Sequence, residues 1–255
     1  MDGTDWPSPV EVVNEGGSSD IVLICEHASN HMPAEYGRLG VAEPELQRHI
    51  AWDVGAAAVT CGLSRLLDAP AFLGTYSRLL VDLNRPFGVP SSMPVRSEAT
   101  DIPGNVGMPD EERERRRRTI FEPFHAAVAA HLDARAQAGR PTILVTIHSF
   151  TPVFLGVARP WHAGILYDQS EGFARRVIEA LSADHSLTVG HNVPYEIERA
   201  SDYAIPVHGT DRGHPAILVE IRHDLIEDEA GIATWIQRLG RVLNQTIEEP
   251  QHAGT

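Results

Sequence analysis

Three apolar segments of this chain each end in groups that can bind a metal ion or carry a proton. They are His27 after residues 21–25, His148 after residues 142–147, and Glu220 after residues 216–219. Such apolar runs are typical of strands in a parallel sheet, and ligands bind at the carboxyl ends of those strands. A lone histidine at a strand end is usually a hydrogen-bonded structural residue. Two histidines and a carboxylate at one edge instead favour a catalytic zinc site with one position left for water.

The third protein ligand of such a site has two candidates. Asp53 lies in the otherwise apolar stretch HIAWDVGA, where a carboxylate needs a compensating partner such as a cation. Its alternative role is that of a helix-terminal, hydrogen-bonded carboxylate. Asn30 follows His27 by three residues, but an amide oxygen is a poor zinc ligand and suits hydrogen bonding to substrate better. We therefore predict His27, Asp53 and His148 as the metal ligands.

The segment SRLLVDLNRP, residues 77–86, sets polar side chains among apolar ones. A guanidinium there could hold a substrate carboxylate through two parallel hydrogen bonds. The alternative is an internal ion pair between Asp82 and an arginine. Both interpretations hold if one arginine pairs with Asp82 and the other is available to the substrate. The candidate substrate-binding residues are Arg78, Asn84, Arg85 and Asn30, with His208 of the loop VHGTDRGH as a further hydrogen-bond donor.

The elements that position these residues alternate between strands and helices along the chain. We predict strands at 21–26, 70–76, 142–147, 153–158, 164–167 and 216–221, and helices at 43–67, 110–138, 170–183 and 230–247. Alternation of this kind indicates an α/β fold with three α/β/α layers and a mainly parallel, mixed sheet. The proline-rich segment 86–109 is long for a loop, and we expect it to border the active site.

Composition limits the possible functions. The chain of 255 residues is 42% hydrophobic and shows no repeat or break in composition, so we predict one domain, 1–255, with flexible termini at about 1–18 and 248–255. The formal net charge of -14 argues against nucleic acid as a partner. All 21 basic residues are arginine, which excludes Schiff-base lysine chemistry and a P-loop lysine.

The chain shows neither a membrane-length apolar run nor the pattern of a signal peptide. Its two cysteines, Cys25 and Cys61, form no CxxC pair. We therefore expect a cytoplasmic protein that does not contact membranes. The oligomeric state leaves no signal in the sequence.

Four separated motifs occur in a characteristic order: CEHASNHMP at 25–33, SRLLVDLNRP at 77–86, TIHSF at 146–150 and VEIRHDLI at 219–226. With these motifs the chain resembles the N-formylglutamate amidohydrolase family from about residue 21 to residue 243. That family is similar to the zinc carboxypeptidases. The resemblance implies a zinc-peptidase-like fold, a Zn²⁺ cofactor, and hydrolysis of a small N-formyl or other N-acyl amino acid such as N-formyl-L-glutamate.

The resemblance also implies a role for individual residues. His27 and His148 match the zinc histidines, Asn84 and Arg85 match the pair that handles the substrate carboxylate and oxyanion, and Glu220 matches the general base. Asn30 stands where the related pattern has a glutamate ligand, which is why Asp53 is the preferred third ligand. The opening CEHASN also departs from the PHSG form of histidine-degrading members, which indicates a divergent branch whose substrate need not be N-formylglutamate.

Three alternatives remain open from the sequence. The first is a zinc peptidase or a deacylase with a different acyl group. The second is a cysteine hydrolase in which His27 activates Cys25, although no electropositive group for a thiolate is evident. The third is a binding protein without catalytic activity on the same scaffold. The presence of Asn30 in place of the glutamate ligand favours this alternative.

Overall fold

A seven-stranded sheet forms the centre of the protein, whose computed structural model describes residues 6–248. In spatial order its strands are β1 (Val10–Val13), β3 (Ala71–Gly74), β2 (Ile21–Cys25), β6 (Ile143–Phe150), β11 (Ala216–Arg222), β9 (Ala163–Leu166) and β10 (Val189–His191). The neighbours β3, β2, β6 and β11 run parallel, and so do β9 and β10. β1 and β9 pair antiparallel with β3 and β11. The sheet is thus mainly parallel and mixed, as predicted.

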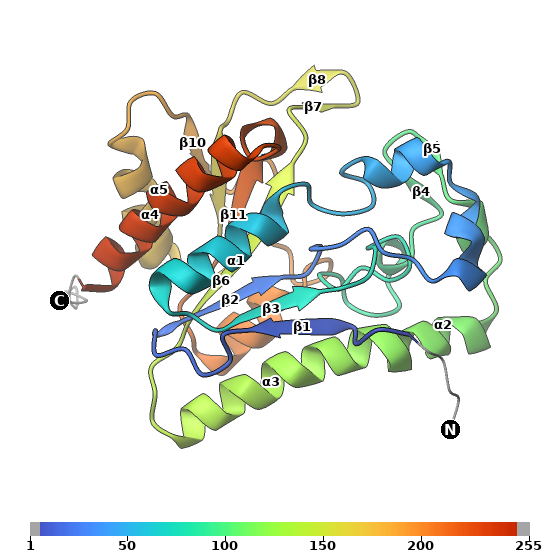
Figure 1. The fold of residues 1–255 in the computed structure, drawn as a ribbon, viewed down its shortest axis with the longest axis horizontal. Helices are drawn as coiled ribbons and strands as arrows, with labels where there is room; N and C mark the ends of the chain where they lie inside the picture. Colours follow the sequence, from blue (N-terminus) through green and yellow to red (C-terminus); the bar gives the residue numbers. More distant parts are fainter. Residues whose placement is uncertain (1–5, 249–255) are drawn as a thin grey trace.

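Helices cover both faces of this sheet (Figure 1). α1 (Ala56–Leu67), α4 (Glu171–Ser182) and α5 (Glu229–Glu248) pack on one face. The other face is covered by a continuous helical segment made of α2 (Asp110–Arg116), a π-helical turn (Arg117–Phe121) and α3 (Glu122–Gln137). This three-layer α/β/α arrangement confirms the predicted fold class.

The two faces follow from the alternation of side chains along each strand. In β2, Ile21, Leu23 and Cys25 join the core beneath α1, α4 and α5, while Val22 and Ile24 join the core beneath α3. Every residue of β2 is buried, which is why the strand reads as an unbroken apolar run. Glu26 is the next residue in this alternation after Val22 and Ile24. Its side chain is therefore expected on the face of the sheet that α3 covers.

Short elements connect these layers. They are the 3-10 segments η1 (Ala34–Gly40), η2 (Glu43–Gln47), η3 (Pro90–Ser92), η4 (Pro103–Asn105), η7 (Thr210–Arg212) and η8 (His223–Leu225), the π-helical turn η6 (Ala204–Gly209), and the strand pairs β4 (Arg96–Ser97) with β5 (Thr100–Asp101) and β7 (Val153–Phe154) with β8 (Val157–Ala158). Among residues 6–248, no helix combines the length and hydrophobicity that a membrane crossing requires.

The predicted helix over 43–67 is wrong in its first half. Residues 43–47 form η2, and α1 begins only at Ala56, because Gly55 adopts a left-handed conformation with φ of 79°. A Cβ at Gly55 would lie 2.1 Å from the carbonyl oxygen of Ile226, so the close approach requires glycine. The chain before α1 is thereby free to follow a non-helical path past Asp53.

Two further predictions are corrected. Residues 153–158 do not form one strand of the sheet but the separate hairpin β7–β8, because Leu155 and Gly156 both turn the chain with positive φ. Part of the predicted flexible N-terminus, residues 10–13, forms edge strand β1 against β3. Of the residues predicted to be flexible, 1–5 and 249–255 lie outside the described residues, and residue 248 ends α5.

Candidate active site

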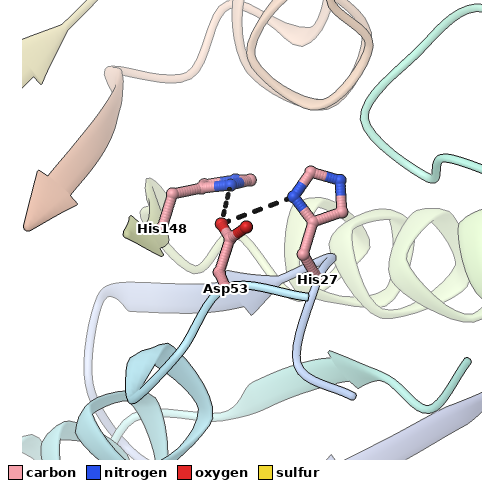
Figure 2. Close-up of side chains that lie close together, drawn as sticks. All are labelled: His27, Asp53 and His148. Carbon is pink, nitrogen blue, oxygen red and sulfur yellow. Dashed lines mark hydrogen bonds and ion pairs between the residues drawn. The ribbon is translucent and has the colours of Figure 1, made fainter. Parts of the chain in front are cut away.

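Three buried side chains meet at the carboxyl edge of the sheet (Figure 2). Asp53 Oδ2 lies 2.8 Å from His148 Nδ1 and 3.4 Å from His27 Nδ1. One ligand atom from each residue lies within 4.8 Å of the others. Ligand atoms around a tetrahedral zinc ion lie about 3.3 Å apart when the bonds measure about 2.0 Å. The group therefore has the chemistry and spacing that a metal ion requires.

Parallel strands and one backbone hydrogen bond bring these residues together. His27 lies two residues beyond the end of β2, and His148 lies on the adjacent parallel strand β6. Asp53 comes from the segment before α1, where its N–H donates to the carbonyl of His27 at 2.9 Å. The N–H of Ser149 in turn donates to Asp53 Oδ2 at 3.2 Å. The aspartate is thus anchored at both its backbone and its carboxylate.

Each histidine has a second carboxylate near Nε2, the ring nitrogen that does not face Asp53. His27 Nε2 donates to Asp82 Oδ1 at 2.7 Å, and His148 Nε2 lies 2.9 Å from Glu26 Oε2, although that pair is not aligned as a hydrogen bond. A carboxylate at the outer nitrogen of a histidine keeps the proton there and leaves the inner nitrogen free for a metal. Both imidazoles are therefore oriented to present Nδ1 toward Asp53.

Burial and charge act against each other in this group. Burial favours the neutral carboxyl, but His27 and His148 outweigh it and hold the pKa of Asp53 below its usual range. Burial also favours neutral His148, yet Glu26 and Asp53 outweigh it and raise the pKa of His148 well above its usual value. Anionic oxygens thus dominate the electrostatics at the centre of the site and favour a bound cation.

Glu220 faces the metal-ligand group from the neighbouring strand. It is the register partner of His148 in the β6–β11 pair, and it is buried. Its Oε2 is buried without a hydrogen-bond partner among residues 6–248. Burial raises the pKa of Glu220 to about 7, with Asp53 adding to the shift and His148 and Arg78 opposing it. A carboxyl group that exchanges its proton near neutral pH is suited to general acid-base catalysis.

The two arginines of the segment 77–86 differ in how many of their nitrogens form hydrogen bonds within the protein. Arg78 donates from Nε and Nη2 to Asp82 Oδ2 and from Nη1 to Asp53 Oδ1, so all three nitrogens are engaged. The hydrogen bonds of Arg85 to the described residues all come from Nη1, which reaches Asp202 Oδ1 and the Ser201 carbonyl at 2.7 Å. The ion pair predicted within this segment is thus formed by Arg78 and Asp82. Arg85 keeps the N–H groups of Nε and Nη2 available to donate to a ligand.

A cavity of about 140 Å³ joins these residues. The residues that line it are His27, His49, Asp53, Arg78, Asn84, Arg85, His148, Ser149, Phe150, Leu166, Tyr195, Asp202, Leu218 and Glu220. Asn84 uses its Oδ1 to accept the backbone N–H groups of Tyr203 and Ala204, which leaves its amide nitrogen as a donor. The candidate metal ligands, the candidate base and the candidate carboxylate-binding residues therefore line one cavity.

Sequence reasoning missed several of these lining residues, including Tyr195. The loop that carries Tyr195 lies against Gly164 of β9, where a Cβ would stand 1.6 Å from the carbonyl oxygen of Val193. Gly164 is the register partner of Glu220, so this approach brings the loop over the site. A glycine inside an apolar strand was the available signal for a close backbone approach. No local pattern identified Tyr195 itself.

Two predicted substrate-binding residues, Asn30 and His208, do not line this cavity. Asn30 donates from Nδ2 to the Leu46 carbonyl at 2.9 Å, so it fastens a turn. His208 is buried, with Nε2 3.0 Å from Nδ1 of His125, because η6 packs it inward against the helical layer. Both side chains therefore serve the fold around the site.

The structure also argues against the cysteine hydrolase. Cys25 is completely buried and does not line the cavity. Burial raises the pKa of its thiol well above the usual value, and the nearby carboxylates of Asp53 and Glu26 add to the shift. A thiolate nucleophile requires the opposite environment. Cys25 is thus part of the core beneath α1.

Replacing Asp82 tests the carboxylate behind His27. We expect Asp82→Asn to weaken zinc affinity by about 10-fold to 100-fold, because His27 loses the acceptor that orients its ring. Competition with a chelator measures the affinity. Asp202→Asn is the matched control, since Asp202 lines the same cavity but contacts Arg85 and no metal-ligating histidine. Equal affinities for the Asp82 variant and wild type would contradict the orienting role.

Comparisons with known proteins identify related sequences and structures. Residues 19–227 match the model of the N-formylglutamate amidohydrolase family. A crystal structure of a gene product from Agrobacterium tumefaciens is 38% identical over 94% of this chain and 95% of that one, with a TM-score of 0.91. That of N-formylglutamate amidohydrolase from Ralstonia eutropha is 20% identical over 94% and 98% of the two chains, with a TM-score of 0.66. No curated protein matched the sequence.

Proposed function

This chain belongs to the N-formylglutamate amidohydrolase family, and on that premise we propose that it uses zinc to hydrolyse the amide bond of an N-formyl or other N-acyl amino acid. One observation carries the proposal. The buried group of His27, Asp53 and His148 shares a cavity with Glu220, whose Oε2 is buried and unpartnered among the described residues. Metal ligands and a free base in one cavity are the parts that metal-assisted hydrolysis needs.

The three ligands suit zinc chemically. Two imidazole nitrogens and one carboxylate oxygen leave a fourth tetrahedral position open, as in catalytic zinc sites. A zinc ion held by these three residues would supply the positive charge that polarises an amide carbonyl and acidifies a water molecule. Asp82 and Glu26, behind the two histidines, maintain the orientation of the rings.

Glu220 acts as the general base in this proposal. Its carboxylate accepts a proton from the attacking water and delivers it to the nitrogen of the leaving amine. Burial raises the pKa of the Glu220 carboxyl to about 7 in the metal-free protein. The positive charge of a bound zinc ion would lower it and favour the carboxylate form that accepts a proton. Arg78 holds Asp53 and Asp82 in place and does not reach for substrate.

Arg85 and Asn84 bind the substrate in this proposal. The unengaged edge of the Arg85 guanidinium can take a carboxylate in two parallel hydrogen bonds. Asn84 contributes its amide N–H groups beside it, since its oxygen is held by the backbone of Tyr203 and Ala204. Asp202 and the Ser201 carbonyl hold Nη1 of Arg85 and thereby aim the free edge into the cavity.

We expect Arg85→Lys to raise KM for an N-formyl amino acid by about tenfold or more while changing kcat less. Lysine keeps the charge but loses the planar fork that matches a carboxylate. Steady-state kinetics on the acid and on its α-carboxamide provide the measurement. The carboxamide should lose little, because it carries no carboxylate. Equal losses on both substrates would place Arg85 at the oxyanion instead.

Metal analysis and a formate assay test the function directly. Purified protein should hold close to one zinc per chain, release formate from N-formyl amino acids, lose this activity with a chelator and regain it with zinc. Turnover of N-acetyl amino acids or peptides in place of N-formyl compounds would favour the deacylase or peptidase alternative. A protein that takes up no metal and releases no formate would favour the binding protein.

A further inference from the structure

Several buried polar atoms around His148 have no hydrogen-bond partner among residues 6–248. They are both carboxylate oxygens of Glu26, the Thr146 hydroxyl, His148 Nε2 and His208 Nδ1. None of these four residues is more than 3% exposed. Buried polar groups in folded proteins almost always have a partner, in the protein or in ordered water. This group of atoms therefore requires a physical explanation.

Three of the four residues project from one face of the sheet. Thr146 precedes His148 by two residues on β6, so the two side chains lie on the same face. Glu26 is on this face as well, because its Oε2 lies 2.9 Å from His148 Nε2. It is the face that the helical layer of α2 and α3 covers.

The η6 segment brings His208 to the same face. Its last residue, Gly209, packs so closely that a Cβ there would lie 2.4 Å from the Cβ of Ala216, a core residue beneath α3. Burial, with Arg212 adding to it, lowers the pKa of His208 to about 4, and the Glu26 carboxylate opposes this shift. That influence agrees with a place for His208 near Glu26.

The hydrogen bonds of His125 determine which nitrogens of the two histidines carry protons. His125 Nε2 lies 2.9 Å from the Leu83 carbonyl, which can only accept, so Nε2 carries the proton. Burial lowers the pKa of His125 well below its usual value, so the ring is neutral and its Nδ1 is an acceptor. His208 Nε2, 3.0 Å from this Nδ1, therefore donates to it. Neutral His208 then has no proton on Nδ1, which is a second buried acceptor.

Acceptors thus outnumber donors in this group of atoms. The Glu26 carboxylate and His208 Nδ1 accept, whereas only the Thr146 hydroxyl and His148 Nε2 donate. His148 Nε2 uses its proton toward Glu26, as metal-binding histidines do toward a neighbouring carboxylate. One water molecule supplies the two missing donors. Such a water would accept from the Thr146 hydroxyl and make about three hydrogen bonds, as buried waters usually do.

We propose that a buried water molecule joins Glu26 to His208, and that His208 and His125 are positioning residues for His148. The water donates to Glu26 and to His208 Nδ1, and it accepts from Thr146. A chain of hydrogen bonds then extends from His125 to His148 and keeps the Glu26 carboxylate where it orients the ring of His148 toward the metal. This inference rests on the proposed function for the zinc ion that His148 binds.

Nuclear magnetic resonance of protein with isotope-labelled histidine tests the proton positions without any measurement of activity. Long-range proton–nitrogen correlation spectra show which ring nitrogen of each histidine carries a proton. We expect His125 and His208 to be neutral with the proton on Nε2, in metal-free and zinc-loaded protein alike. A proton on Nδ1 of His208 overturns the inference, because that atom would then donate toward Glu26 without a water.

A crystal structure of the zinc-loaded protein tests the water itself. One ordered water should lie within about 3.2 Å of both a Glu26 oxygen and His208 Nδ1. A direct hydrogen bond between these two side chains, a metal ion at this place, or the absence of any density there overturns the inference.

Two substitutions of His208 separate positioning from packing. The terminal oxygen of asparagine can take the place of Nδ1, whereas the terminal amide of glutamine reaches only toward His125. His208→Gln should weaken zinc affinity by about tenfold, the lower end of the range for residues that orient a metal ligand, and His208→Asn should weaken it less. Competition with a chelator measures both affinities. Wild-type affinity in both variants, or equal losses in both, overturns the inference.

His131→Gln is the matched control. His131 belongs to the same helical layer, but its ring packs against Phe72, with 5.1 Å between the ring centroids, and it does not line the cavity. Zinc affinity should stay unchanged, and a loss equal to that of His208→Gln contradicts the positioning role.

The outcomes also separate this inference from the proposed function. If the His208 variants bind zinc as expected but the wild-type protein releases no formate, the proposed function is wrong and the inference stands. If the wild type releases formate while the His208 variants bind zinc as the wild type does, the inference alone is wrong.

Discussion

Glu220→Gln should retain zinc and substrate affinity while kcat falls by a factor of about 10² to 10⁴, the usual contribution of a general acid-base group. Glutamine keeps the shape of glutamate but cannot accept a proton from water. The side chain should be tolerated, because Oε2 of Glu220 has no hydrogen-bond partner to lose among the described residues. Single-turnover kinetics at saturating substrate, with zinc measured on the same samples, separate the chemical step from binding.

The matched control is Glu227→Gln, the same substitution at an exposed glutamate that lies outside this cavity. It should leave kcat unchanged. If Glu220→Gln is purified without zinc, Glu220 belongs to the metal ligands and the base must be another carboxylate, with Asp53 the next candidate. If kcat is unchanged while zinc is retained, the water is activated without Glu220, and the assignment of the base is wrong.

Removal of a metal ligand should have the second large effect. We expect His27→Ala, His148→Ala and Asp53→Ala each to abolish stoichiometric zinc binding and activity together, because one of three protein ligands is lost. Zinc affinity should fall further than the roughly 10-fold to 100-fold that is typical when a residue hydrogen-bonded to a metal ligand is replaced. Elemental analysis after dialysis, with the formate assay on the same samples, provides the measurement.

Asn30→Ala is the informative control for these variants, since Asn30 occupies the position of a ligand in the related pattern but donates to the Leu46 carbonyl here. It should retain zinc and lose only the hydrogen bond of a turn. Circular dichroism establishes that each variant remains folded, which matters for His148 because its removal leaves Glu26 buried beside an empty space. Zinc loss in Asn30→Ala with retention in Asp53→Ala would reverse the choice of third ligand.

The sequence alone placed His27, His148 and Glu220 at one edge of the sheet. It could do so because apolar runs encode buried strands, and parallel strands bring their carboxyl ends to the same edge. Asp53 was recognised by a different signal, a carboxylate in an apolar stretch. The order of four motifs identified the family, and the match over residues 19–227 confirms it.

The tertiary structure decided which polar groups face each other. The segment that carries Asp53 is not helical because α1 begins only after Gly55, whose left-handed conformation and close approach to the distant carbonyl of Ile226 require glycine. Likewise, Arg78 and Arg85 look equivalent in the sequence. In the structure, Arg78 forms ion pairs with Asp53 and Asp82, whereas Arg85 forms one with Asp202. The pair of Arg78 with Asp82 is local, and the sequence suggested an ion pair of this kind. The pairs of Arg78 with Asp53 and of Arg85 with Asp202 join residues far apart in the chain, so local patterns carry no information about them.

The same reason explains why two predicted residues lie outside the cavity and why one of its lining residues was missed. Asn30 and His208 are polar and follow suggestive motifs, yet the paths of their loops direct them to Leu46 and His125. Tyr195 enters the site because Gly164 lets its loop approach the sheet. The positions of the central strands and the alternation of their side chains depend on nearby residues and were thus readable from the sequence. Strand order, loop paths and the pairing of charges around the cavity depend on long-range packing, and the folded structure alone determined them.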